Sequence, residues 1–123
     1  MKKDIKKAWV AALRSGQYLK GVAALRSKDN KFCCLGVLCN LHAQAHPEIA
    51  AEQQHPHRYL GASAYLPKEV QEWAGISGDN PEVKQTSWIG SEGSSLTSLA
   101  SLASINDSGV SFSEIADLIE TQL

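Results

Sequence analysis

The sequence predicts an α+β fold that is mainly helical, with about five helices and a short β-hairpin or small antiparallel sheet. Apolar residues recur at helical spacing in several segments, a pattern typical of helices that bury one face. Glycine, proline and polar turns separate these segments. With 123 residues, of which 43% are hydrophobic and 20% charged, the composition indicates a single globular domain over residues 1–123.

Five helices are expected: from Lys3 to about Ser15, from Cys34 to about Ala45, from Pro67 to Gly75, from Leu96 to near Asn106, and from Ser111 onward. Glycine is a typical helix stop, and Gly16 and Gly75 stand at two of these ends. Proline suits the first position of a helix, as at Pro67. Ser111 followed by Glu114 is a capping box, which predicts the start of the last helix.

Strands are expected at two places. Val22–Leu25 and Lys31–Cys33 flank a polar turn and predict a short hairpin. Val83–Ile89 predicts a further short strand. Glu48–Ser63 is polar and is predicted to be a surface loop.

The composition also bears on location and partners. No apolar run approaches the roughly 20 residues that a membrane span needs, and no long apolar region follows the basic N-terminus. We therefore expect a cytoplasmic protein with reduced thiols and no membrane partner. Residues 1–60 hold ten of the twelve Lys and Arg, whereas residues 61–123 hold nine of the thirteen Asp and Glu. This asymmetry fits solvated helix faces, an anion bound by the basic half, or opposite faces that meet in a homo-oligomer.

DNA is not an expected partner. The net charge of −1 argues against binding that ignores nucleic-acid sequence. The segment Ile105–Ala116 resembles the centre of helix-turn-helix domains, but Glu114, Asp117 and Glu120 would repel phosphates.

Cys33 and Cys34 stand where a helix N-terminus is expected, and that position favours a thiolate. Their apolar neighbours instead favour simple core packing. His42 and His46 lie one helical turn apart and could bind a metal, but no glutamate stands between them as in metalloproteases, and the cysteine spacing does not match zinc sites. The chain also lacks a phosphate loop and a dinucleotide fingerprint. We therefore expect no metal and no cofactor.

Most of the chain resembles a family of small proteins encoded by phages and prophages. The resemblance is carried by four segments: Trp9–Tyr18 (WVAALRSGQY) followed by Leu25-Arg26, Phe32–Leu41 (FCCLGVLCNL), Leu66–Trp73, and Ile105–Asp117 with its Ile-Asn-Asp and Ser-Phe-Ser-Glu-Ile-Ala-Asp motifs. It implies a phage origin and the cytoplasm of an infected or lysogenic bacterial host. It assigns no activity.

The leading functional hypothesis is a non-enzymatic phage accessory protein that binds and sequesters a small anionic, nucleotide-like host defence signal. Arginine suits bidentate phosphate binding, and a helix N-terminus adds backbone donors. The predicted ligand-binding residues are Arg14, Arg26, Cys33, Cys34, Asn106 and Asp107. The hypothesis expects the arginines and the Asn-Asp turn to face one pocket.

Two alternatives stay open. An inhibitor could dock on a host protein through an acidic face, with the acidic residues Glu69, Glu72, Glu114, Asp117 and Glu120. A cysteine-dependent enzyme that uses Cys33 or Cys34 is the least favoured alternative. The residues favour a non-enzymatic protein without deciding the question.

Overall fold

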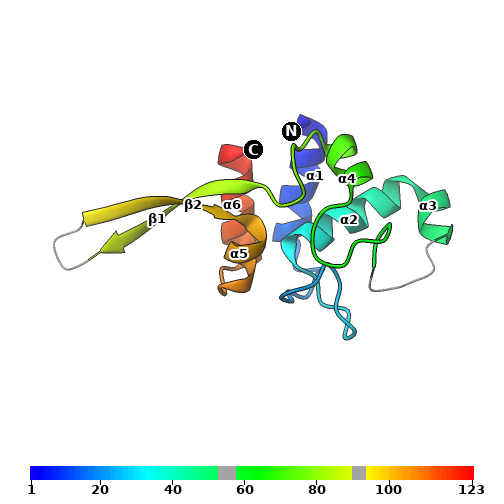
Figure 1. Cartoon of the computed structure of the whole chain (residues 1–123), viewed down its shortest axis with the longest axis horizontal. Helices are drawn as coiled ribbons and strands as arrows, with labels where there is room; N and C mark the ends of the chain where they lie inside the picture. Colours follow the sequence, from blue (N-terminus) through cyan, green and yellow to red (C-terminus); the bar gives the residue numbers. More distant parts are fainter. Residues whose placement is uncertain (53–57, 90–93) are drawn as a thin grey trace.

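The computed structural model describes residues 1–52, 58–89 and 94–123 (Figure 1). Within them the chain forms six helices and a two-stranded antiparallel sheet, which confirms the mainly helical α+β fold. The elements are α1 (Lys3–Arg14), α2 (Cys34–Ala45), α3 (Pro47–Glu52), α4 (Lys68–Ala74), β1 (Glu82–Ile89), β2 (Ser94–Ser101), α5 (Leu102–Asp107) and α6 (Phe112–Gln122).

Helix α2 is the centre of the core. Its first six residues, Cys34–Cys39, are all buried. Helix α1 packs against it with a stripe that includes Trp9, whose indole N–H donates to the backbone oxygen of Cys34 at 2.9 Å. Helix α6 covers another side of α1 with the stripe Phe112, Ile115, Ala116 and Ile119. The apolar spacing read from the sequence therefore marks the buried faces.

Asn106, at the end of α5, ties distant parts of the chain together. It is fully buried. Its Oδ1 accepts a hydrogen bond from the Cys34 N–H at 3.1 Å, and its Nδ2 donates to the Gly21 backbone oxygen at 2.9 Å. The Asn106 backbone oxygen accepts from Lys20 Nζ at 2.6 Å. One residue thus attaches the first turn of α2 and the segment 20–21 to α5.

The caps of the helices explain why several predicted ends are correct. Gly75 follows α4 with a φ of 71°, a left-handed conformation that suits glycine. The Ser111 hydroxyl accepts from the Glu114 N–H at 3.2 Å at the start of α6. The Glu114 carboxylate reaches back to the Ser111 hydroxyl at 3.3 Å. These caps satisfy backbone groups locally, so the sequence alone indicates them.

The sheet forms an arm that projects beyond α5 and α6 (Figure 1). Strands β1 and β2 pair from Glu82 opposite Ser101 to Ile89 opposite Ser94. Contacts with α6 and α5 hold the base of the arm. The strand expected over Val83–Ile89 is therefore confirmed, and its partner is β2.

The hairpin predicted from Val22–Leu25 and Lys31–Cys33 is wrong. This region contains only isolated bridges, from Phe32 to Lys20 and to Arg26. Ala23, in the middle of the first predicted strand, adopts a φ of 64°, which interrupts extended backbone. The Leu25 N–H donates instead to the Ser63 backbone oxygen at 2.8 Å.

Two further predictions need correction. The helix expected from Leu96 begins at Leu102, because Leu96–Ser101 pairs with β1 and the Ser101 hydroxyl caps α5. Leucines three residues apart are compatible with a helix. In a segment this short, however, hydrogen bonding to a neighbouring strand determines whether it forms a helix or a strand. Part of the loop expected over Glu48–Ser63 is α3, whose proline start and early Glu48 suit a helix N-terminus. Residues 53–57 of that loop lie outside the described residues.

We expect Asn106→Ala to lower the free energy of unfolding by about 2–4 kcal/mol, because it removes the partners of the buried Cys34 N–H and of the partly buried Gly21 carbonyl. Urea denaturation followed by circular dichroism measures this. Asn40→Ala is the matched control, since it removes one half-buried bond to the Tyr18 hydroxyl. An equal loss in both variants would refute the special role of Asn106.

Candidate functional site

Four of the six predicted ligand-binding residues lie together at the N-terminus of α2. Asn106 accepts from the Cys34 N–H, and its Nδ2 donates to Asp107 Oδ1 at 3.1 Å. Asp107 Oδ1 also accepts from the Ala23 N–H at 3.1 Å. Cys33 and Asp107 line one small cavity of about 60 Å³. The polar atoms of this cluster already hold the protein backbone, so its evident work is structural.

Arg14 lies elsewhere, between α1 and α6. Its guanidinium contacts Asp117 Oδ1 at 2.5 Å and Glu120 Oε2 at 3.1 Å. The hydrogen bonds that Arg14 donates to Glu120 and then to Asp117 raise the pKa of Arg14. Exposed pairs of this kind contribute little to stability. The contact does neutralise two carboxylates of the acidic face on which the host-protein alternative depends.

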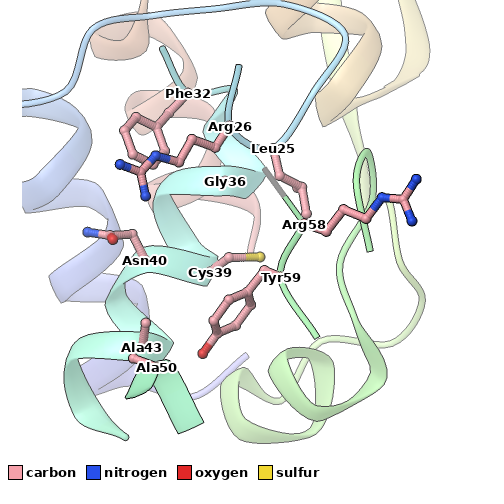
Figure 2. Close-up of a pocket in the computed structure, with 10 residues that line it drawn as sticks. All are labelled: Leu25, Arg26, Phe32, Gly36, Cys39, Asn40, Ala43, Ala50, Arg58 and Tyr59. Carbon is pink, nitrogen blue, oxygen red and sulfur yellow. The ribbon is translucent and has the colours of Figure 1, made fainter. Parts of the chain in front are cut away.

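Arg26 lines a different cavity, of about 200 Å³, between α2, the segment 25–32 and residues 58–59 (Figure 2). The structure therefore does not bring the six predicted residues to one pocket. The residues that line this cavity are Leu25, Arg26, Phe32, Gly36, Cys39, Asn40, Ala43, Ala50, Arg58 and Tyr59. They include two arginines and no carboxylate.

Neighbours hold the Arg26 guanidinium in place. Its Nε and Nη2 donate to Asn30 Oδ1 at 3.1 and 2.9 Å. Its central carbon lies 5.5 Å from the centroid of the Phe32 ring. In Figure 2 the guanidinium lies beside that ring, with the Asn40 amide nearby. These contacts leave Nη1 without a bond to the described residues, so this nitrogen can donate to a ligand.

Arg58 is the site residue that the sequence reasoning missed. In Figure 2 it extends on the side of the cavity opposite Arg26 and points outward at the rim. Within the described residues, no carboxylate lies within 4.0 Å of either arginine. Arg58 belongs to no periodic segment, so only its neighbour Tyr59, anchored in the core, places it beside the cavity. The feature of the sequence that could have indicated Arg58 is that this basic residue directly precedes a tyrosine.

Gly36 allows the walls of the cavity to meet. A Cβ at this position would lie 1.8 Å from the Leu25 backbone oxygen. That is far inside contact distance, so any larger residue would displace the segment that carries Arg26. The glycine in the middle of the Cys-Cys-Leu-Gly run therefore sets the approach of residues 25–26 to α2.

Tyr59 forms another wall and is braced from behind by histidines. Its hydroxyl lies 2.5 Å from His42 Nδ1. The His46 ring stacks on His42 with centroids 4.3 Å apart, and the Trp73 ring meets His42 edge-on at 5.1 Å. Burial, and then the His46 charge, lower the pKa of His42. Burial raises the pKa of Tyr59 to about 12.

The three thiols are buried and used in packing. Cys33 Sγ accepts from the Gly36 N–H at 3.4 Å, and Cys34 Sγ donates to the Leu102 oxygen at 3.6 Å. Burial is the largest cause that raises the pKa of each of the three thiols. A nucleophilic cysteine needs the opposite shift, so this environment argues against the thiol enzyme.

The described residues contain neither a cluster of metal ligands nor a helix suited to a membrane. No group of three or more His, Cys, Asp or Glu side chains in that part of the chain could hold a metal ion. None of its helices is long and apolar enough to cross a membrane.

Comparison with known proteins gives a family. The model of the Domain of unknown function (DUF8296) family matches residues 1–123. The chain belongs to the DUF8296 family. No curated protein and no solved structure matches it.

In this DUF8296 chain we expect the native thiols to resist alkylation at pH 8. Raised pKa values keep them protonated, and burial excludes the reagent. Mass spectrometry after iodoacetamide treatment measures the labelling. Protein unfolded in urea is the control and should label at Cys33, Cys34 and Cys39. Rapid labelling of native Cys33 or Cys34 would contradict this expectation and would support the cysteine-dependent enzyme.

The His42 brace predicts a loss of stability on acidification. The pKa of His42 lies below its ordinary value of 6.5 in the folded chain, so the unfolded chain binds more protons just below pH 6.5. The contribution of neutral His42 to the free energy of unfolding is complete above pH 6.5 and decreases as the pH falls below that value. Urea denaturation at pH 7.5, 6.5 and 5.5 measures it.

His42→Gln is the control for this dependence, because glutamine can accept from the Tyr59 hydroxyl but cannot titrate. We expect the decrease between pH 7.5 and 5.5 to be smaller in this variant. Equal decreases in both proteins would show that His42 is not responsible.

Proposed function

We propose that this protein binds a small anionic, nucleotide-like ligand in the cavity between Arg26 and Arg58 and holds it without chemical change. The observation that carries the proposal is the pair of arginines on a cavity whose other described lining residues are all neutral. Guanidinium groups present forked donors that match phosphate oxygens. Arg26 keeps donors available after its bonds to Asn30.

The rest of the lining supports one flat, partly apolar group beside the anion. Phe32 and Tyr59 supply aromatic carbon, Leu25 and Ala43 supply aliphatic carbon, and Asn40 supplies an amide. The cavity of about 200 Å³ is smaller than the roughly 300 Å³ at which drug-sized sites begin. A ring the size of a single base therefore fits inside, with its phosphate at the arginine rim.

The titratable lining groups favour binding over catalysis. General acid–base catalysis needs a pKa near the working pH. Burial raises the pKa of Cys39 far above that range and the pKa of Tyr59 to about 12. His42 lies behind Tyr59 and its Nδ1 is engaged with the Tyr59 hydroxyl. Sequestration is the role that such a site supports.

The wider role remains a proposal that rests on the sequence resemblance. Small phage proteins that bind a nucleotide-like signal would remove it from a host defence system. Arg14, Cys34 and Asn106 do not line the cavity and enter this proposal only as parts of the scaffold. The host-protein alternative is not taken further, because Arg14 engages both Asp117 and Glu120.

Isothermal titration calorimetry against nucleoside monophosphates, diphosphates and cyclic dinucleotides tests the proposal. We expect Arg26→Ala and Arg58→Ala each to weaken binding roughly tenfold to hundredfold, the range for losing charge-assisted hydrogen bonds of about 1.5–3 kcal/mol. Arg14→Ala is the matched control, because it removes an arginine from α1 and should leave the affinity unchanged.

Failure of the wild-type protein to bind any of these nucleotides would overturn the proposal. So would binding that Arg14→Ala weakens and Arg26→Ala does not, since that result would place the anion between α1 and α6.

A further inference from the structure

The two outer edges of the projecting arm, one on β1 and one on β2, differ in their hydrogen-bond partners. Strands β1 and β2 pair only with each other, and the far part of the arm stands clear of the helices (Figure 1). A two-stranded hairpin is marginally stable alone, because it needs a third strand or a packed helix. Helices α5 and α6 pack against the strands only at the base of the arm.

Gln122, the last residue of α6, covers the outer edge of β1 at Lys84. The Lys84 N–H donates to Gln122 Oε1 at 2.6 Å, and Gln122 Nε2 donates to the Lys84 oxygen at 2.8 Å. The side-chain amide thus makes the two bonds that a neighbouring strand would make. This contact also shows that Lys84 directs its backbone groups away from β2.

The register then identifies the outward groups of β2. In an antiparallel pair, alternate residues direct both backbone groups outward, and opposite residues do so together. Leu99 lies opposite Lys84, and Thr97 opposite Thr86. The outward residues of β2 are therefore Ser95, Thr97 and Leu99. The bond from the Leu102 N–H to the Pro81 oxygen at 2.8 Å continues the same alternation.

At Leu99, no described residue covers this edge of β2. No described group bonds to the outward N–H or C=O of Leu99, whose side chain is 65% exposed. Natural edge strands are usually protected by charges, prolines or bulges. The run Ser94–Ser101 contains no charged residue and no proline. It is an unprotected edge of a kind that pairs with another strand.

We propose that two copies of this chain pair β2 with β2 in antiparallel fashion, about a twofold axis, to form a four-stranded sheet. A second copy suits this edge, because a twofold axis perpendicular to β2 places the same strand of the other copy antiparallel to it. In a register with Thr97 opposite Thr97, Ser95 falls opposite Leu99, and all of these positions direct backbone groups outward. An uncharged strand brings no like charges together across the axis. The twofold pairing also gives a closed dimer instead of an open fibre.

This interface is independent of the ligand proposal. The cavity is lined from α2, α3 and the segment 58–59, and in Figure 1 helix α3 lies at the end of the molecule opposite the arm. Pairing of the arms therefore leaves the Arg26–Arg58 cavity open in each copy.

Sedimentation equilibrium of the full chain tests the dimer. We expect a dimer for the wild type, and a dissociation constant raised roughly tenfold or more for Thr97→Pro, which removes an outward N–H, and for Leu99→Lys, which adds a charge to the edge. Thr86→Pro is the matched control, because it removes an outward N–H from the other edge and should leave the dimer intact.

Amide hydrogen exchange separates edge pairing from loss of the arm. Thr97 and Leu99 amides should become more protected as the protein concentration rises, whereas Thr86 should not. A wild-type chain that is monomeric at its highest soluble concentration would overturn the proposal. A dimer that Thr86→Pro disrupts, while Thr97→Pro and Leu99→Lys do not, would also overturn it.

Discussion

The buried side chain of Asn106 is the constraint on which the arrangement of the chain depends. Its amide satisfies the Cys34 N–H at the start of α2 and the Gly21 carbonyl, two groups far from it in sequence. Buried backbone groups without partners are costly, so this one residue makes three segments mutually dependent. Trp9 completes the junction by donating to the Cys34 carbonyl. Asn106, which was predicted to contact a ligand, is thus buried within the protein.

The cavity follows from the same packing. Helix α2 is buried over Cys34–Cys39, and Gly36 lets the chain at Leu25 pass within backbone contact. Beyond that contact the walls separate, and the space between them becomes the Arg26–Arg58 cavity. The packing that hides the thiols therefore also creates the pocket. This explains why the cysteine-rich segment contributes walls to a site without supplying a nucleophile.

Helix α6, the cavity and the arm differ in the charges that they present. Carboxylates of α6 engage Arg14, so part of the acidic half of the sequence is balanced within the fold. The cavity retains two arginines without carboxylates in its lining. The arm presents uncharged backbone at the opposite end. The cavity that we propose binds an anion and the strand edge that we propose pairs with a second copy therefore lie in different parts of the molecule.

The sequence by itself determined the helices whose signals are local. The apolar stripe of α1, the Ser111 cap of α6 and the Gly75 end of α4 need no distant partner, and the family match spans all 123 residues. Only the tertiary structure decided the rest. Leu96–Ser101 became a strand because β1 lies beside it, and the positive φ of Ala23 interrupts the first strand of the expected hairpin. Arg58 and Arg26 line the same cavity because distant segments pack on α2, and spacing along the chain does not encode this arrangement.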